Sequence, residues 1–315
     1  MTRLLVLLVL LSLGATPAAA YDVKESPLLA PAVASGELPP AAERLPAEPL
    51  VVDLAARARE PGVQGGTLRM FITRARDVRY MVVYGYARLV GYDENYELKP
   101  DIARAVDNVD DRIFTFHLRK GHRWSDGQPF TSEDFRYFWE DVANDPDLSP
   151  GGVPEFLLVD GEPPTVTILD ETTIRYEWRA PNPRFLTELA AARDPFIYRP
   201  AHYLKKFHAK YTPADSLAPA MAKHKVRNWA ALHNTMDNMY NNDNPELPTL
   251  QPWTVKSDRN QQGYDLYRNP FYHRVDQAGI QLPYIDKVEL TIAAAGLIAQ
   301  KVTLGEVDLQ VRSLT

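Results

Sequence analysis

The chain has 315 residues, of which 24% are charged, and a formal net charge of −6. A length of this kind is enough for about two domains, and an acidic chain without a basic stripe argues against nucleic acid as a partner. The sequence contains no Cys, which excludes a disulfide framework, thiol chemistry and a lipid anchor on an N-terminal Cys.

Residues 1–20 are typical of a cleavable secretory signal peptide. Arg3 precedes an almost purely apolar run from Leu4 to Leu13, and the small residues GATPAAA follow. We expect cleavage after Ala20. The alternative is a membrane anchor, but about ten apolar residues are too few to span a bilayer. Export without lipidation predicts a free periplasmic protein, whose net charge becomes −7 once Arg3 is removed.

Residues 21–65 form an N-terminal arm rich in Pro and Ala. Its first part, residues 21–50, carries little apolar surface to offset the entropy of ordering, so we expect it to be extended or disordered. Residues 51–60 are predicted to form a short helix, and PGVQGG at 61–66 breaks the chain before the folded domain at 66–315.

Within the folded domain, strands and helices alternate without a strict βαβ rhythm. Residues 91–103 are predicted to be a turn followed by a short helical piece. Strands are expected at 67–73, 113–119, 263–268 and 286–293, a hairpin at 165–178, and helices at 80–90, 184–192, 200–208 and 226–240. The pattern predicts an α/β fold with mixed sheets.

The stretch RKGHRWSDGQPFTSEDFRYFWE, residues 119–140, places a His, a Ser and several acids close together. Gly127 suits a tight turn, and Thr131 with Asp134 resembles a capping box at the start of a helix. Ser125 and His122 lie three residues apart in a turn and lack a G-x-S-x-G elbow. We therefore interpret the segment as structural and predict no catalytic residue.

Metal and nucleotide sites are not indicated. The seven His residues show no H-x-x-x-H or H-E-x-x-H spacing, and no G-x-x-x-x-G-K-[ST] loop is present. We predict neither a metal nor a cofactor.

Six segments in order resemble the family 5 bacterial extracellular solute-binding proteins, the peptide- and nickel-binding class of ABC importers. The match runs from about residue 64 to 315. Its segments are LRMFIT, YARLVGYDENYELKPDIARAV, FTFHLRKGHRWSDGQPFTSEDFRYFWE, VTILDETTIRYEW, YRNPFYH, and LPYIDKVEL with GEVDLQ.

The resemblance implies a periplasmic binding protein of type II-like architecture, with mixed sheets and two lobes that close on a ligand. Residues 66–315 would supply the first lobe, with an inserted subdomain at roughly 80–180, and the second lobe would be missing. It also implies a monomer that captures a peptide or an oligosaccharide between its lobes and delivers it to an ABC permease at the inner membrane. Any ATP hydrolysis would belong to a partner protein.

The resemblance also places two loops at the ligand cleft. From the loop after the first strand it implicates Arg74, Arg76, Asp77 and Tyr80, and from the loop near 241–253 it implicates Asn244, Thr249 and Trp253. Arg and Asp side chains could hold the termini of a peptide by charge-assisted hydrogen bonds. The alternative for each residue is a solvated loop.

Two other classes remain open. A secreted hydrolase would need two acids that caps, turns and surface do not explain. A one-lobed secreted interaction protein would use this lobe without a transported ligand.

If the second lobe is missing, residues 21–315 alone should bind ligand weakly or not at all, because half of the pocket is absent. Calorimetry on this segment tests that expectation, and tight binding would contradict it. The intact mass of the protein isolated from its source separates the causes: about twice the mass of this chain would mean a fragment, whereas the mass of residues 21–315 would favour the interaction protein.

Overall fold

The computed structural model describes residues 23–193, 195–241, 243–256 and 262–314. The expected signal peptide, residues 1–20, lies outside them. Within the described ranges, no helix combines the length and the apolar character needed to cross a membrane.

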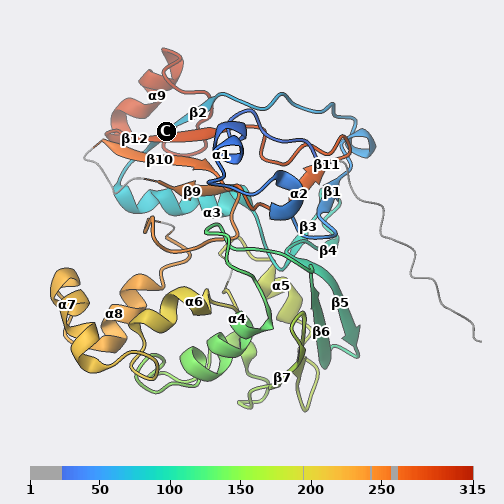
Figure 1. Ribbon diagram of the computed structural model, residues 1–315, viewed down its shortest axis with the longest axis vertical. Coiled ribbons are helices and arrows are strands. Elements are labelled where there is room, and N and C mark those ends of the chain that lie inside the picture. The colour runs from blue at the N-terminus through green and yellow to red at the C-terminus, as the bar shows by residue number, and fades with distance from the viewer. Residues whose placement is uncertain (1–22, 194, 242, 257–261, 315) are drawn as a thin grey trace, which may run out of the picture.

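The first sheet is mixed and has four strands in the order β2-β12-β10-β9. Strand β2 (Thr67–Ile72) runs parallel to β12 (Lys287–Ile292), whereas β10 (Gly263–Arg268) is antiparallel to both β12 and β9 (Trp253–Val255). Helix α3 (Tyr80–Gly85) follows the short turn η2 (Ala75–Arg79) and lies along this sheet (Figure 1). Val78 and Met81 join the apolar residues of the four strands in a small core. The strands predicted at 67–73, 263–268 and 286–293 are confirmed.

The second sheet is antiparallel, in the order β5-β6-β8-β7. Its strands are β5 (Ala103–Val109), β6 (Ile113–Leu118), β7 (Thr165–Asp170) and β8 (Thr173–Glu177). The strand at 113–119 and the hairpin at 165–178 are therefore confirmed. One face packs the aromatic side chains of Phe114, Phe116, Tyr176 and Trp178 into the larger core of the molecule, where Phe114 and Trp178 meet Phe185 of a neighbouring helix edge to face.

The prediction of a helical piece within 91–103 is wrong. The segment forms a hairpin of β3 (Val90–Tyr92) and β4 (Leu98–Pro100), and β5 follows directly. Asp93 accepts hydrogen bonds from the backbone N–H groups of Asn95 and Glu97. This Asx turn closes the hairpin and competes with helical hydrogen bonds.

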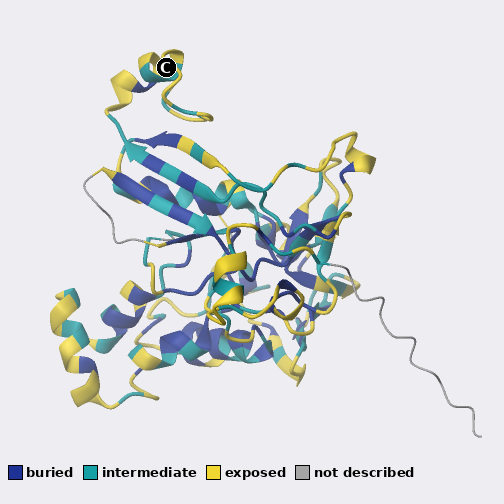
Figure 2. Cartoon of the chain, turned by 45° about the horizontal axis from the view of Figure 1, so that its top comes forward, coloured by how far each residue is buried: buried dark blue, intermediate teal, exposed yellow. Residues whose placement is uncertain are grey.

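Helices fill the remaining positions. The predicted capping box is confirmed: Thr131 and Asp134 exchange bonds at the start of α4 (Ser132–Arg136), which continues into the π-helical η3 (Tyr137–Ala143). The predicted helices near 184–192, 200–208 and 226–240 are present but shorter. The other helical elements are η4 (Glu155–Leu157), α5 (Phe185–Leu189), α6 (Ala201–Leu204), η5 (Lys205–Phe207), α7 (Ala214–His224), α8 (Trp229–Met236) and α9 (Ala295–Thr303). Helix α7 and the segment from α9 onward are mainly exposed (Figure 2).

The N-terminal arm is ordered from residue 23 onward, so the prediction that residues 21–50 are extended or disordered is wrong for the part described. It contains α1 (Ala30–Ala34), α2 (Ala41–Arg44), and β1 (Leu50–Val52), which pairs with β11 (Arg274–Asp276). The expected helix at 51–60 is instead part of β1 followed by η1 (Ala55–Arg57).

Arg44 explains why an arm with little apolar surface is ordered. Its side chain is fully buried and bonds to Glu25 at 2.7 Å, to Pro39 O at 2.6 Å and to Pro270 O at 3.0 Å. Burial would raise the pKa of Glu25, but the guanidinium holds it below its ordinary value. A paired and hydrogen-bonded buried cation replaces the apolar contacts that the sequence lacks.

A buried polar junction around Asp101 joins the hairpin β3–β4 to β11. The Asp101 carboxylate accepts bonds from Arg274 Nε at 2.9 Å and from the backbone N–H of Arg88 at 2.9 Å, and it lies 2.7 Å from His273 Nε2. The ring of His122 lies 5.0 Å from that of His273. Arg274 outweighs the burial of Asp101 and keeps the pKa of Asp101 far below its usual range.

The buried histidines predict a loss of stability in acid. Burial lowers the pKa of His273 to about 4, against the opposing effect of Asp101. Between pH 6.5 and 4 the unfolded chain therefore binds a proton at this position that the folded chain does not, and stability falls as the pH falls. For His273 the loss from pH 7 to pH 5 is about 2 kcal/mol.

Urea unfolding of wild type and His273→Gln at pH 7 and pH 5 measures this contribution. The variant should lose about 2 kcal/mol less than wild type across that interval, whatever its stability at pH 7. His224→Gln, at the partly exposed end of α7, is the matched control and should lose as much as wild type. Equal losses in all three proteins would show that His273 does not contribute.

Candidate functional site

A cavity of about 310 Å³ opens at the carboxyl end of β2. The carboxyl ends of neighbouring parallel strands are a common place for ligand sites in open α/β sheets, and β2 and β12 are such neighbours. The walls come from the end of β2, the turn η2, helix α3 and the C-terminal segment. They comprise Met70, Phe71, Ile72, Thr73, Arg74, Asp77, Tyr80, Met81, Tyr84, Leu290, Gln310, Val311, Arg312 and Ser313.

Asp77 is held rigidly at the base of the turn. Its carboxylate accepts a bond from Thr73 Oγ1 at 2.7 Å and lies 3.4 Å from Arg74 Nε. Burial alone would raise the pKa of Asp77, but these two donors outweigh it and leave the pKa below the ordinary value. The site therefore contains a fixed negative charge beside a half-exposed guanidinium.

Two tyrosines of α3 form the aromatic wall. The rings of Tyr80 and Tyr84 lie 6.2 Å apart, one helical turn along the chain. The Arg312 guanidinium lies 4.2 Å from the centre of the Tyr80 ring, and that of Arg79 lies 5.6 Å from it. Aromatic faces and guanidinium groups are side chains that bind sugars and peptides well.

The structure brings together three of the four residues implicated in the first loop: Arg74, Asp77 and Tyr80. Arg76 is exposed on the same turn but is not part of the cavity wall. Trp253 lies in β9, packs against the small core and donates its Nε1–H to Ile285 O at 3.2 Å.

Asn244 and Thr249 lie elsewhere, in a recess of about 130 Å³ that they share with Ser125, Asp126 and residues 245–248. Asn244 donates to Tyr203 Oη at 3.1 Å, and Ser125 Oγ accepts from Thr249 N at 3.0 Å. The residues of the two loops therefore do not share one cavity in this structure.

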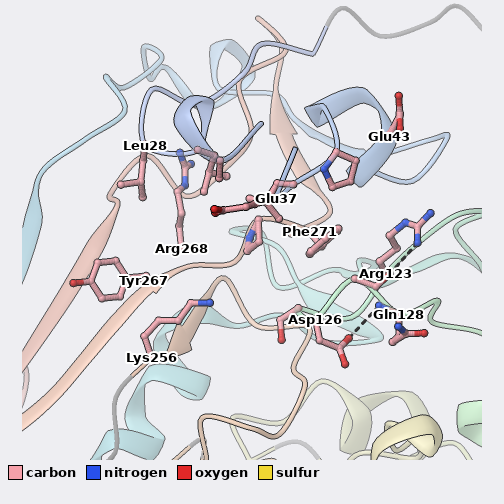
Figure 3. Close-up of a pocket in the computed structure, with 17 residues that line it drawn as sticks. Leu28, Glu37, Glu43, Arg123, Asp126, Gln128, Lys256, Tyr267, Arg268 and Phe271 are labelled. Atoms are coloured by element: carbon pink, nitrogen blue, oxygen red, sulfur yellow. Dashed lines mark hydrogen bonds between the residues drawn. The ribbon is translucent and has the colours of Figure 1, made fainter. Parts of the chain in front are cut away.

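A larger groove of about 760 Å³ lies between the arm and the turn at 123–128 (Figure 3). Leu28 and Glu37 of the arm form one side, Asp126 and Lys256 the other, and Phe271 lies between them. This volume is in the range of small-molecule sites. The groove exists because the arm is ordered, so no local sequence pattern pointed to it.

The C-terminal segment contributes wall residues that no sequence motif singled out. Asp308 bonds through its carboxylate to Arg69 N at 2.8 Å, and the Gln310 amide accepts from Phe71 N at 2.9 Å. These side chains take the place of a neighbouring strand along the open edge of β2, which brings Arg312 to Tyr80. The only available signal was the motif GEVDLQ, which marked the segment without indicating where it docks.

The structure confirms that the stretch at 119–140 has a structural role. Asp134 accepts from Trp124 Nε1, Thr131 N and Ala201 N, Glu133 pairs with Arg136 and Lys205, and Asp126 lies 2.8 Å from His202 Nε2. In the part of the chain that the structure describes, no group of three or more His, Asp or Glu residues could hold a metal ion.

The chain belongs to the bacterial extracellular solute-binding proteins, family 5, whose family model matches residues 97–313. This confirms the resemblance found in the sequence motifs. The chain is 30% identical to a periplasmic alpha-galactoside-binding protein of Rhizobium meliloti over 282 residues. The aligned region covers 83% of this chain and 38% of that protein. The chain is also 29% identical to the periplasmic oligopeptide-binding protein OppA of Escherichia coli over 144 residues. That aligned region covers 41% of this chain and 26% of OppA.

Solved structures show the same fold. An oligopeptide-binding protein OppA superposes with a TM-score of 0.84 at 35% identity, over 93% of this chain and 45% of that one. The periplasmic binding protein MelB of Agrobacterium fabrum, in complex with stachyose, superposes with a TM-score of 0.72 at 27% identity. The superposition covers 92% of this chain and 44% of MelB. The α/β fold with mixed sheets is thereby confirmed, and the chain spans less than half the length of these relatives.

Proposed function

We propose that this chain supplies one ligand-binding lobe of the periplasmic substrate-binding component of an ABC importer. The support is the family membership together with the position of the cavity, at the carboxyl end of β2. In this proposal the ligand enters between this lobe and a second one, and an inner-membrane permease receives it. Export through a signal peptide at 1–20 and a periplasmic location belong to the same proposal.

The proposed ligand is a peptide or an oligosaccharide. The relatives named above are described as binding oligopeptides, alpha-galactosides and stachyose. The cavity offers the groups that either ligand needs: the fixed carboxylate of Asp77, the guanidinium of Arg74 and the aromatic wall of Tyr80 and Tyr84. The proposal keeps four further candidates for contact with the ligand, which lie outside this cavity wall: Arg76, Asn244, Thr249 and Trp253.

The proposal assigns no catalytic step to the chain. A hydrolase would need a pair of acids free to act on substrate. In the stretch at 119–140, Asp126, Glu133 and Asp134 all have structural partners. No observation here favours the interaction protein over the transport component.

Truncation of Tyr80 tests where the ligand binds. Tyr80→Ala removes the central ring of the cavity, and an aromatic anchor in a binding site is worth about 2 kcal/mol or more, so affinity should fall at least about tenfold. Calorimetry with stachyose and with a set of tripeptides, on the protein as its source makes it, measures the effect.

Leu28→Ser is the matched control, because Leu28 is 41% exposed and lines the groove of Figure 3 instead. It should bind like wild type. A loss in Leu28→Ser without a loss in Tyr80→Ala would move the site to that groove, and absence of binding to every probe in wild type would contradict the proposed function.

A further inference from the structure

Positive charge is concentrated at the cavity beside β2, although the whole chain has a net charge of −6. The turn after β2 carries Arg74, Arg76 and Arg79 within six residues, and the C-terminal segment adds Arg312. Among the described residues that line the cavity, Asp77 is the only carboxylate. Arg74 and Arg312 thus line the cavity together with one acid, and Arg76 and Arg79 lie on the neighbouring turn outside its wall.

Among the described residues, no acid balances three of these guanidinium groups. Arg74 lies 3.4 Å from Asp77, but in the described ranges no ion pair reaches Arg76, Arg79 or Arg312. The Nε of Arg79 is buried and has no hydrogen-bond partner among the described atoms. Arg79 is not part of the cavity wall, so it adds positive charge beside the cavity without a direct contact to a ligand there.

Tyr80 holds two of the guanidinium groups close to the cavity. Arg312 and Arg79 lie 4.2 and 5.6 Å from the centre of its ring. Stacking on an aromatic face orders a guanidinium without using its N–H groups. Arg312 also interacts with the Tyr84 hydroxyl, and its remaining N–H groups can bind an anion. The like charges repel each other, and a bound anion would relieve that repulsion.

We propose that this cavity recognises a carboxylate of the transported ligand, with Arg312 as the specificity-determining residue. The inference rests on the proposed function and adds the charge of the ligand to it. Two ligand types carry this group: an oligosaccharide that contains a uronic acid, and a peptide with its free C-terminal or acidic side-chain carboxylate. In both, the carboxylate contacts the guanidinium groups, and Asp77 discourages a second negative charge nearby.

Matched ligand pairs test the proposal on the protein as its source makes it. One pair is digalacturonate and the neutral galactobiose, and the other is an alanine tripeptide with a free C-terminus and its C-terminal amide. Calorimetry should show at least about tenfold tighter binding of the charged member of one pair. That preference should shrink when NaCl is raised from about 20 to about 500 mM, since salt screens charges at a partly exposed site. The pair that shows it identifies the ligand type.

Arg312→Gln should reduce the preference for the charged member to less than about threefold. Arg227→Gln, at an exposed position outside the cavity, is the matched control that should keep the wild-type preference. The comparison of charged and neutral ligands uses the wild-type protein, so it tests the proposal even if a variant fails to fold.

Binding of charged and neutral members with equal affinity would overturn the inference and leave the proposed function intact. A preference that survives in Arg312→Gln would overturn the assignment to this residue. If neither pair binds, the carboxylate inference is wrong, and if stachyose and the tripeptide set also fail to bind, the proposed function falls with it.

Discussion

The structure depends on one buried carboxylate, that of Asp101. A buried charge is tolerated only when partners surround it, and here they come from widely separated parts of the chain: Arg88 before the hairpin β3–β4, and His273 with Arg274 beside β11. Arg119 extends the junction, since it donates to Asp101 O and to Glu48 O in the arm. The hairpin β3–β4, the second sheet, β11 and the arm are therefore fixed relative to one another by polar contacts whose loss would leave charges unpaired.

Helix α3 connects this frame to the candidate site. Its first residue, Tyr80, forms the cavity wall, and its last, Gly85, packs against Pro252 so closely that a Cβ at Gly85 would lie 2.8 Å from the proline ring. The helix thus spans the distance between the turn after β2 and the loop before β9. The two loops that the family resemblance implicated are held by one short rigid element, even though their side chains line different hollows.

Local patterns were sufficient for much of the fold. The alternation in residues 113–119 and the Thr131–Asp134 cap depend on neighbours in sequence, and both predictions were correct. The order of the arm could not be predicted, because it depends on the bonds of Arg44 to residues as distant as Pro270. Arg312 was missed for the same reason: only the docking of Asp308 and Gln310 on β2 brings it to Tyr80. The cavity is formed by contacts between residues far apart in the sequence, and the spacing of residues does not predict such contacts.

The docking of the arm also has a consequence for the order in which the protein can be built. The arm is made first, but many of the atoms that hold it, from Arg268 to Gly279, are made more than 200 residues later. Contacts so far apart in sequence form late and slowly. A nascent chain must therefore keep its first segment unengaged until the residues around Arg268 and Pro270 have been made.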